Sequence, residues 1–390
     1  MFPRFSDLLN YILGSALDFP VQTYGFFLAL AFLSAAMILR IELKRKEKEG
    51  LLHPITRKVL KNKPAGISEI LGGAFLSAAI GYKLLGIVLD YGTFQQDPQK
   101  YLLSSQGSLT AALIILIISL GHSLYRNHLL GKKGVVETEV TLHPAQHTWS
   151  ILIVAILSAL IGSKLFDIID NFGSFMRDPF GSIFSFQGLT FYGGLIVTVI
   201  VLLFYMKVIK LDWKYVIDAA APAIMLGYAI GRLGCHLSGD GCWGIVNELT
   251  KPEWLTWLPD WAWTSHYPHN VIREGIPIPG CMGSNCTMLE KPVWPTSLYE
   301  STASALFFLV LWFSRKKMSA PVTLFGLFLI LNGIERFFIE KIRVNHRFRF
   351  LGMNPTQAEI ISTCLVITGI IVILYFTHQS RKTKKPPLHD

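Results

Sequence analysis

Two arginines and one glutamate recur on a single predicted helix face near the C-terminal end of the sequence. Arg336, Glu340 and Arg343 are four and then three residues apart, a spacing that places side chains on one side of a helix. Glu340 can pair with either arginine. A guanidinium group offers a planar fork of N–H donors that suits phosphate oxygens in a water-poor site. The pattern therefore predicts a site for a phosphate-bearing headgroup.

A third arginine lies in a glycine-rich motif. Arg232 belongs to residues 231–244, which read Gly-Arg-Leu-Gly-Cys-His-Leu-Ser-Gly-Asp-Gly-Cys-Trp-Gly. So many glycines at the end of an apolar segment permit a tight, irregular backbone, which a membrane tolerates only beside a cavity. The motif also contains four residues with potential metal-binding atoms: Cys235, His236, Asp240 and Cys242. Their spacing, C-H-x5-C, matches none of the common zinc patterns, so no metal and no cofactor are expected.

Further polar residues open other apolar segments. Tyr24 begins the first segment, Tyr192 the fifth, and Tyr299 and Glu300 the seventh. A single tyrosine at this position is common at a membrane interface. Because all of these residues lie at the same predicted depth, we expect that they belong to a common site. Four cations fall inside the apolar segments: Lys83, Lys164, Arg232 and Arg336. Charges at membrane depth are functional candidates by default, although the lysines could instead snorkel to the headgroups.

Long apolar segments must position these residues. The chain has 390 residues, of which 51% are hydrophobic and only 16% charged, whereas a soluble globular protein carries about 25% charged residues. A transmembrane helix needs roughly 20 mostly apolar residues. The sequence therefore predicts an all-α, polytopic membrane protein with about nine spans, near 24–39, 67–89, 109–124, 148–169, 188–207, 216–237, 296–313, 322–339 and 356–376.

The formal charge of +10 is distributed in a way that argues against nucleic-acid binding. Basic runs follow the first, third, fifth, seventh and ninth segments, so the alternate loops are cytoplasmic by the positive-inside rule. We therefore expect the N-terminus outside, the C-terminus in the cytoplasm, and basic loops that contact anionic membrane lipids. The candidate residues then gather at the outer side.

Residues 238–295 form a long tryptophan-rich segment between the sixth and seventh spans. The predicted topology places this segment outside, where a Cys281–Cys286 disulfide is plausible. The tryptophans favour the membrane interface. They indicate either a simple aromatic belt or a cover over a lateral entrance for lipid.

The sequence contains an internal repeat. Residues 76–107 and 157–188 align without gaps, and the alignment pairs Gly81 with Gly162 and Lys83 with Lys164. Each copy reads as a helix, an outer loop and the start of a second helix. Because repeats are common in transporters, a transport function stays open.

At these residues the chain resembles the prolipoprotein diacylglyceryl transferase family. The family's Tyr-Gly appears as Tyr24-Gly25, and its Phe-His-Gly-Gly motif appears as Phe191-Tyr192-Gly193-Gly194, with tyrosine for histidine. Its Gly-Arg-x-Gly signature begins intact at 231–234, then departs at Cys235, His236 and Asp240. Its His-Pro-x-Gln-Leu-Tyr-Glu motif appears at 294–300 with Trp294 and Ser297. Its Arg-x3-Glu-x2-Arg ending is intact at 336–343.

The resemblance implies one transferase-like membrane domain over 1–390, in which 67–124 is an inserted hairpin copy of 148–207, because family members look like seven-span proteins. It implies transfer of diacylglyceryl from phosphatidylglycerol to the lipobox cysteine of a prolipoprotein signal peptide, in the bacterial cytoplasmic (inner) membrane, with glycerol phosphate leaving. Catalytic roles then fall on Arg232, Arg336, Glu340, Tyr24, Tyr192, Asp240 and His236. Substrate-binding roles fall on the two arginines with Arg343, Lys164, Gly193, Gly194, Tyr299 and Glu300.

The general base stays open, because the family's histidine is absent. Tyr192, Tyr24, Asp240 or His236 are the candidates, or the field of the arginines lowers the pKa of the thiol. Two other functions stay open as well. A divergent member could pass or hydrolyse a lipid headgroup unit with another acceptor, and a transporter of lipid or solute is the third hypothesis.

Overall fold

The computed structural model describes residues 1–96, 101, 104–184, 190–344 and 355–384. Parts of both repeat copies, including 97–100 and 185–188, lie outside this range. The chain separates into two compact units. The first comprises Met1–Pro3, Gln22–Pro54 and His143–Asp390, and the second comprises Arg4–Val21 and Ile55–Leu142.

The first unit contains all the predicted site residues. Its long helices are α2 (Thr23–Lys48), α7 (Thr148–Asp170), α10 (Phe191–Val208), α11 (Trp213–Ser238), α13 (Thr296–Ser314), α14 (Thr323–Glu340) and α15 (Gln357–Lys384). Its short elements are η1 (Pro144–His147), α8 (Phe172–Arg177), α9 (Pro179–Phe184), η2 (Glu253–Leu255), α12 (Asp260–Trp263), β3 (Ile276–Pro277) and β4 (Thr287–Met288).

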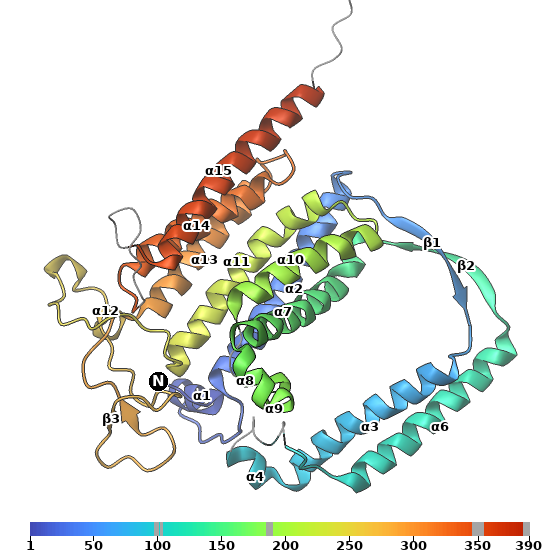
Figure 1. The fold of residues 1–390 in the computed structure, drawn as a ribbon, viewed down its shortest axis with the longest axis horizontal. Helices are drawn as coiled ribbons and strands as arrows, with labels where there is room; N and C mark the ends of the chain where they lie inside the picture. The colour runs from blue at the N-terminus through green and yellow to red at the C-terminus, as the bar shows by residue number, and fades with distance from the viewer. Residues whose placement is uncertain (97–100, 102–103, 185–189, 345–354, 385–390) are drawn as a thin grey trace, which may run out of the picture. The chain divides into compact units, whose positions relative to one another are not determined.

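Helix α11 lies at the centre of the first unit. Asp212 caps its first turn by accepting a hydrogen bond from the backbone N–H of Lys214, and Gly239 ends it in the left-handed conformation. The helix packs against α2, α13 and α14, while α14 packs against α15 (Figure 1). Ala219 and Ala221 are fully buried on α11. Such small residues let helix backbones approach closely inside a membrane.

Eight helices in the described parts of the chain are long and apolar enough to cross a membrane: Thr23–Lys48, Ile67–Leu89, Leu109–Lys133, Pro144–Asp170, Phe191–Val208, Trp213–Ser238, Thr296–Ser314 and Gln357–Lys382. Many of their apolar side chains face outward, and Ile117 and Phe204 are each 69% exposed. Apolar surface of this extent suits contact with lipid rather than water. The protein is therefore a multi-pass membrane protein, as expected. The remaining predicted span, 322–339, is helix α14, which is not among these eight and carries three charged residues, Glu335, Arg336 and Glu340, within its 18 residues.

Two features differ from the sequence expectation. Helix α2 continues to Lys48, so the basic residues expected to follow the first span at Leu39 lie inside the helix. The protein is mostly helical but not free of strands. In the second unit, β1 (Ile55–Lys61) pairs antiparallel with β2 (Val136–Leu142).

The second unit also contains α1 (Phe5–Leu13), α3 (Ile67–Leu89), α4 (Tyr91–Gln96) and α6 (Leu109–Lys133). Helix α3 packs against α6, as α7 packs against α10 in the first unit. Both repeat copies are thus helix pairs. Gly81 and Gly162 lie at equivalent helix contacts, since an added Cβ would fall 2.1 Å from Ile115 Cδ1 and 2.6 Å from the carbonyl oxygen of Gly193 respectively. That the first copy is an insertion stays a prediction.

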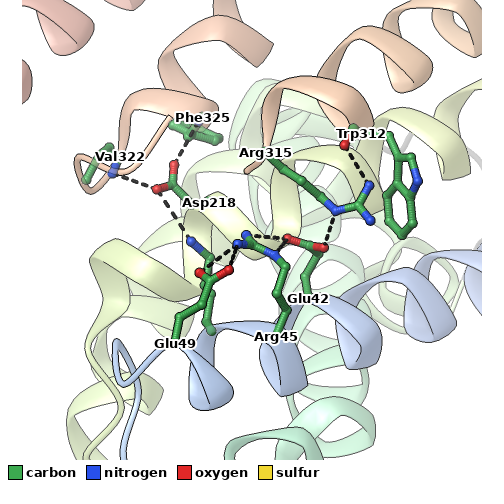
Figure 2. A network of polar contacts seen from close by, with 9 residues as sticks. Glu42, Arg45, Glu49, Asp218, Trp312, Arg315, Val322 and Phe325 are labelled. Carbon is green, nitrogen blue, oxygen red and sulfur yellow. Dashed lines mark hydrogen bonds and ion pairs between the residues drawn. The ribbon is translucent and has the colours of Figure 1, made fainter. Parts of the chain in front are cut away.

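A buried polar network links α2 with α13 (Figure 2). The Glu42 carboxylate is fully buried and pairs with Arg45 NH2 at 2.8 Å and with Arg315 Nε at 2.9 Å. Arg45 also pairs with Glu49 at 2.7 Å. Arg315 donates to the carbonyl oxygen of Trp312. Two cations thus neutralise one carboxylate that has no access to water.

The same network reaches the start of α14. Asp218 on α11 accepts hydrogen bonds from the backbone N–H groups of Val322 and Phe325, both at 2.9 Å (Figure 2). Lys46 Nζ lies 3.8 Å from the same carboxylate. Asp218 therefore caps α14 from a neighbouring helix, where a negative charge is favourable. We call Glu42, Arg45, Lys46, Asp218 and Arg315 the Glu42 network.

Candidate active site

Arg232 lies in the last third of α11 and points toward α13. Its Nε is 2.9 Å from Glu300 Oε2, an ion pair between the two helices. The ring of Tyr228, one turn earlier on α11, lies 5.2 Å from the guanidinium carbon. The hydroxyl of Ser301 donates to the carbonyl oxygen of Ala229 at 2.8 Å. This second contact fixes the register in which Arg232 meets Glu300.

Glu300 joins three arginines from three parts of the chain. Its side chain is fully buried, and its Oε1 lies 3.4 Å from Arg336 NH1 and 3.2 Å from Arg343 NH1. Arg336 NH2 also pairs with Glu340 at 3.1 Å. All five residues were predicted as parts of one site, and the structure shows that Glu300 connects the arginines. We call Arg232, Glu300, Arg336, Glu340 and Arg343 the Glu300 cluster.

The three guanidinium groups retain capacity for a further anion. Each carries five N–H donors, and the ion pairs above engage one or two of them per arginine. The side chains of Arg232, Arg336 and Arg343 are 19%, 27% and 19% exposed. Partly exposed arginines that surround one carboxylate can add charge-assisted hydrogen bonds to phosphate oxygens.

The tryptophan-rich segment holds Arg343 in place. The backbone N–H of Ile245 donates to the carbonyl oxygen of Ile342 at 2.9 Å, and Gly244 pairs with Arg343 in an isolated antiparallel bridge. A Cβ on Gly244 would fall 2.3 Å from that carbonyl oxygen. Glycine is thus required here, because any side chain would separate the segment from Arg343.

The motif after Arg232 folds back on itself beyond the end of α11. Gly239 and Gly241 have φ angles of +66° and +91°, in the region that favours glycine. The turn brings the Cys235, Asp240 and Cys242 side chains together, so that one ligand atom from each lies within 4.8 Å of the others.

Two backbone contacts fix this turn. Asp240 Oδ1 accepts a hydrogen bond from the backbone N–H of Cys242 at 3.1 Å. The carbonyl oxygen of Cys242 accepts another from Thr296 Oγ1 at 2.9 Å. Since Thr296 begins α13, the turn is anchored to the helix that carries Glu300.

Tyr24 faces this turn from the start of α2. An added Cβ on Gly234 would fall 2.6 Å from Phe27 Cβ and 3.8 Å from Tyr24 Cα, so the two helices are in close contact here. Tyr24 lies within electrostatic reach of Arg232 and of the Cys235 turn. Its residue surface is 39% exposed. Of the predicted tyrosines, Tyr24 is the one that the structure brings to the Arg232 motif by these contacts.

His236 points in a different direction. The residue is 4% exposed, and its Nδ1 lies 3.1 Å from the Tyr267 hydroxyl. Burial raises the pKa of the Tyr267 hydroxyl, which stays protonated and can donate to the imidazole. The ring of Trp261 lies 6.1 Å away. The histidine therefore fastens α11 to the tryptophan-rich segment.

The predicted residues of the second hairpin copy have local partners. Lys164 Nζ pairs with Asp167 at 2.9 Å on α7. An added Cβ would fall 2.3 Å from Phe166 Cβ at Gly193 and 2.3 Å from Ser163 Oγ at Gly194, so both glycines serve the packing of α7 on α10. Tyr192 is 39% exposed, and among described residues no hydrogen bond or ion pair joins it to the Glu300 cluster. Its predicted role as base stays a prediction.

Tyr299 connects α13 to the tryptophan-rich segment. Its hydroxyl donates to the carbonyl oxygen of Ala262 at 2.9 Å. In the same segment the expected Cys281–Cys286 disulfide is present. Part of the segment forms a small core around Tyr267, Leu289 and Val293, with Met1 and Trp243 packed against it. Three tryptophans stay well exposed: Trp254, Trp257 and Trp261. The segment is therefore partly a folded cap and partly an aromatic surface.

Sequence reasoning missed Glu335, which precedes Arg336. Its residue surface is 5% exposed, and neither carboxylate oxygen has a hydrogen-bond partner in the described structure. It lies within electrostatic reach of Glu300 and all three arginines. The available signal was an acidic residue inside a long apolar segment, where only lysine and arginine were interpreted as functional candidates. Asp218, inside the predicted span 216–237, was missed in the same way, whereas Glu42 lies beyond the predicted end of the first span at Leu39.

A mostly helical, multi-pass fold that gathers three arginines on one buried carboxylate defines a membrane protein with a site for an anionic group. The family model of prolipoprotein diacylglyceryl transferases matches residues 113–375. The chain belongs to this family, as the motifs of the sequence predicted.

Individual relatives carry the same name. Over 281 residues the chain is 30% identical to a phosphatidylglycerol–prolipoprotein diacylglyceryl transferase of Leptospira interrogans, with 60% of this chain and 80% of the relative covered. Enzymes of that name from Clostridium novyi and Oceanobacillus iheyensis are 29% and 27% identical. These matches cover 60% and 57% of this chain, and 81% and 70% of the relatives.

Proposed function

We propose that this chain transfers the diacylglyceryl group of phosphatidylglycerol to the lipobox cysteine thiol of a prolipoprotein. A thioether forms, and glycerol phosphate leaves. The names of the relatives supply both substrates. The observation that carries the proposal is the convergence of three partly exposed arginines on Glu300.

The Glu300 cluster suits the leaving group of this reaction. As the bond between glycerol carbon and phosphate oxygen breaks, negative charge grows on the phosphate. Fixed cations that face this charge in a site with little water stabilise the transition state. Arg232 and Arg336 are assigned to the phosphate, with Arg343 as a third contact. Glu300 holds the three cations near one another, and Glu340 orients Arg336.

The proton of the acceptor thiol needs a recipient or a route to water. Tyr24 and Asp240 lie beside Arg232 and are favoured over the other two candidates. The imidazole of His236 is turned toward Tyr267, and within the described parts of the chain no hydrogen bond or ion pair links Tyr192 to the cluster.

The cluster is assigned to the outer side of a bacterial cytoplasmic membrane. Basic residues concentrate at the opposite helix ends, as in Arg45, Lys46 and Lys48 of α2 and Arg315 after α13. By the positive-inside rule those ends face the cytoplasm. The arginines of the Glu300 cluster then face the compartment in which prolipoproteins emerge.

A depletion experiment tests the proposal. The gene is expressed in a bacterium whose own diacylglyceryl transferase is depleted, and modified prolipoprotein is followed by gel shift. The wild-type chain should restore growth and the shift, and Arg336→Ala should lose both. Lys291→Ala is the matched control, because Lys291 belongs to an exposed ion pair with Glu248 in the tryptophan-rich segment. If the wild-type chain reaches the membrane and no prolipoprotein is modified, either in the host or with a prolipoprotein from its own source, the proposal is wrong.

A second candidate is transfer to another acceptor, or hydrolysis. It is favoured by the departures at Tyr192, Cys235, His236 and Asp240 from the family motifs. Release of glycerol phosphate from phosphatidylglycerol vesicles by the purified chain, in the absence of a lipobox peptide, would support it. Dependence of that release on the peptide thiol supports the transferase.

A further inference from the structure

The turn after α11 gathers three side chains whose chemistry goes beyond phosphate binding. Cys235 Sγ, Cys242 Sγ and a carboxylate oxygen of Asp240 all lie within 4.8 Å of one another. Cys235 is 7% exposed, Cys242 is partly buried, and neither is in a disulfide. Two ligands at 2.3 Å from a tetrahedral metal lie about 3.8 Å apart. The three donors therefore need to move by less than about 1 Å to hold one cation.

The spacing of these residues in the sequence did not predict this arrangement. The pattern C-H-x5-C predicted no metal, since it counts His236, which points to Tyr267 instead. In the structure Asp240, and not His236, lies beside the two cysteines. Gly239 and Gly241 adopt positive φ angles that turn the backbone, so that Asp240 comes close to Cys235. The two thiols and the carboxylate lie within electrostatic reach of one another, so the donors already converge.

The charges of the surroundings suit a bound cation. Two thiolates and one carboxylate carry three negative charges, which a divalent cation reduces to one. Arg232 lies within electrostatic reach of both cysteines and offsets the remaining charge. Thiolate donors select zinc and related cations over magnesium or calcium. Three protein ligands leave one tetrahedral position open, which is typical of catalytic zinc sites.

We propose that Cys235, Asp240 and Cys242 form a binding site for a thiophilic divalent cation, zinc by its donor chemistry, and that the acceptor thiol occupies the open position. The second half of this proposal rests on the proposed transferase function. The site offers a second way to deprotonate the acceptor thiol, because the family's histidine is replaced by Tyr192 in this sequence.

The chemical step balances with this cation in place. The lipobox thiol binds the metal as a thiolate, and its proton passes to water. The sulfur lone pair attacks the terminal glycerol carbon of the diacylglyceryl group, and a C–S bond forms. The C–O bond to the phosphate breaks, and its electron pair leaves with glycerol phosphate toward Arg232 and Arg336. The metal keeps its oxidation state, and no other reactant is needed.

Metal binding is measured on the full-length chain in detergent, purified by a tag without histidine. The reduced protein is equilibrated with zinc, washed and analysed by mass spectrometry for metal. We expect about one zinc per chain. Cobalt in place of zinc should give the thiolate-to-metal charge-transfer absorption of cysteine ligands. That absorption should change on addition of a lipobox peptide, and stay unchanged with the same peptide carrying serine for cysteine.

Variants assign the ligands. Cys235→Ser and Cys242→Ser should lower zinc affinity by at least about tenfold. Cys364→Ser is the matched control, since this exposed cysteine on α15 lies outside the cluster, and it should bind zinc as the wild type does. Asp240→Asn removes the charge of the ligand but should still fold, because the asparagine side-chain oxygen can accept the hydrogen bond from the Cys242 N–H. It should lower zinc affinity while the thermal midpoint is retained.

Several results would overturn the site. One is a chain that retains no zinc although alkylation finds Cys235 and Cys242 free. Another is a Cys235–Cys242 disulfide in protein alkylated directly in the membrane. Equal zinc content in the wild type and both serine variants also contradicts it. Transfer that persists at the full rate after complete metal removal refutes the role of the cation while the transferase assignment stands. Zinc bound by these ligands in a chain without transfer activity refutes the transferase assignment instead.

Discussion

The Glu42 network and the Glu300 cluster use the same residue types at opposite ends of α11, α13 and α14. Asp218 and Arg232 are fourteen residues apart on α11, about 21 Å along the helix axis at 1.5 Å per residue. In the network, both oxygens of Asp218 accept backbone N–H groups, and Glu42 lies between two arginines. Each of these charged side chains faces an opposite charge, and the side chains of Arg45 and Arg315 are 15% and 12% exposed.

The Glu300 cluster is arranged the other way. Three cations share one buried carboxylate, and each keeps part of its surface exposed. Glu335, the additional acid beside them, has neither oxygen hydrogen-bonded in the described structure. The number of cations that share one carboxylate, three at Glu300 and two at Glu42, therefore distinguishes the two regions better than composition does. A carboxylate with two cations stabilises helix packing, whereas three cations around one carboxylate can also receive an anionic substrate.

The sharpest test of this contrast changes Arg232. Arg232→Ala should lower the rate of diacylglyceryl transfer by about 10²–10³-fold, because a preorganised donor to the developing charge is lost. Arg232→Lys keeps the charge but loses the planar fork, and should restore only part of the rate. Initial rates with phosphatidylglycerol vesicles and a lipobox peptide measure both.

The thermal midpoint is the control for Arg232. It should fall only modestly in Arg232→Ala, because Glu300 keeps Arg336 and Arg343. Loss of folding in step with activity would show that the cluster is structural, and would remove the distinction from the Glu42 network.

The converse test changes Glu42. Glu42→Ala leaves Arg45 and Arg315 without their shared partner and should destabilise the protein by about 3–5 kcal/mol. The measurement is the detergent-solubilised thermal midpoint, and the rate per folded molecule should stay near that of the wild type. Glu248→Ala, which disrupts an exposed pair with Lys291, is the matched control and should change the midpoint little. An inactive but stably folded Glu42→Ala would place the network in the function.

Local spacing predicted the Glu300 cluster in part. Arg336 and Glu340 are one turn apart on α14, so their pairing follows from the period of the helix, whereas Arg343 pairs with Glu300. Their convergence with Arg232 on Glu300 joins α11, α13 and α14, and no local pattern specifies which of several buried acids lies between the arginines. The predicted depth of the residues indicated the region but not the central carboxylate.

Other misses have equally local causes. The apolar run ends at Leu39, which predicts the end of the first span at that residue. Helix α2 nevertheless continues to Lys48, because the charged residues after Leu39 are good helix formers. His236 was counted with the cysteines because it is adjacent in sequence, although on α11 it points to Tyr267. The role of Tyr192, which stands where the family has a histidine, stays a prediction.

A smaller effect is expected from Gly244, which acts on the cluster through Arg343. Gly244→Ala places a Cβ 2.3 Å from the Ile342 carbonyl oxygen and should displace Arg343 from Glu300. We expect about a tenfold loss of rate, as a displacement of roughly 1 Å commonly costs up to 10². Gly231→Ala is the matched control in the same motif, because its Cβ would meet nothing within 4 Å. Equal rates for both variants would mean that Arg343 does not contact the phosphate.

The smallest effect is expected from Tyr192→Phe. Its hydroxyl has no hydrogen bond to the Glu300 cluster among described residues, and the adjacent Gly193 and Gly194 serve helix packing. The rate should therefore fall by less than about threefold, well below the 10²–10⁴-fold contribution typical of a general base. Tyr24→Phe, measured in parallel, should cost more, because Tyr24 lies beside Arg232 and the Cys235 turn. If Tyr192→Phe loses 10²-fold or more while it folds normally, the α7–α10 hairpin must approach the cluster when substrate binds, and the site would extend across both helix pairs.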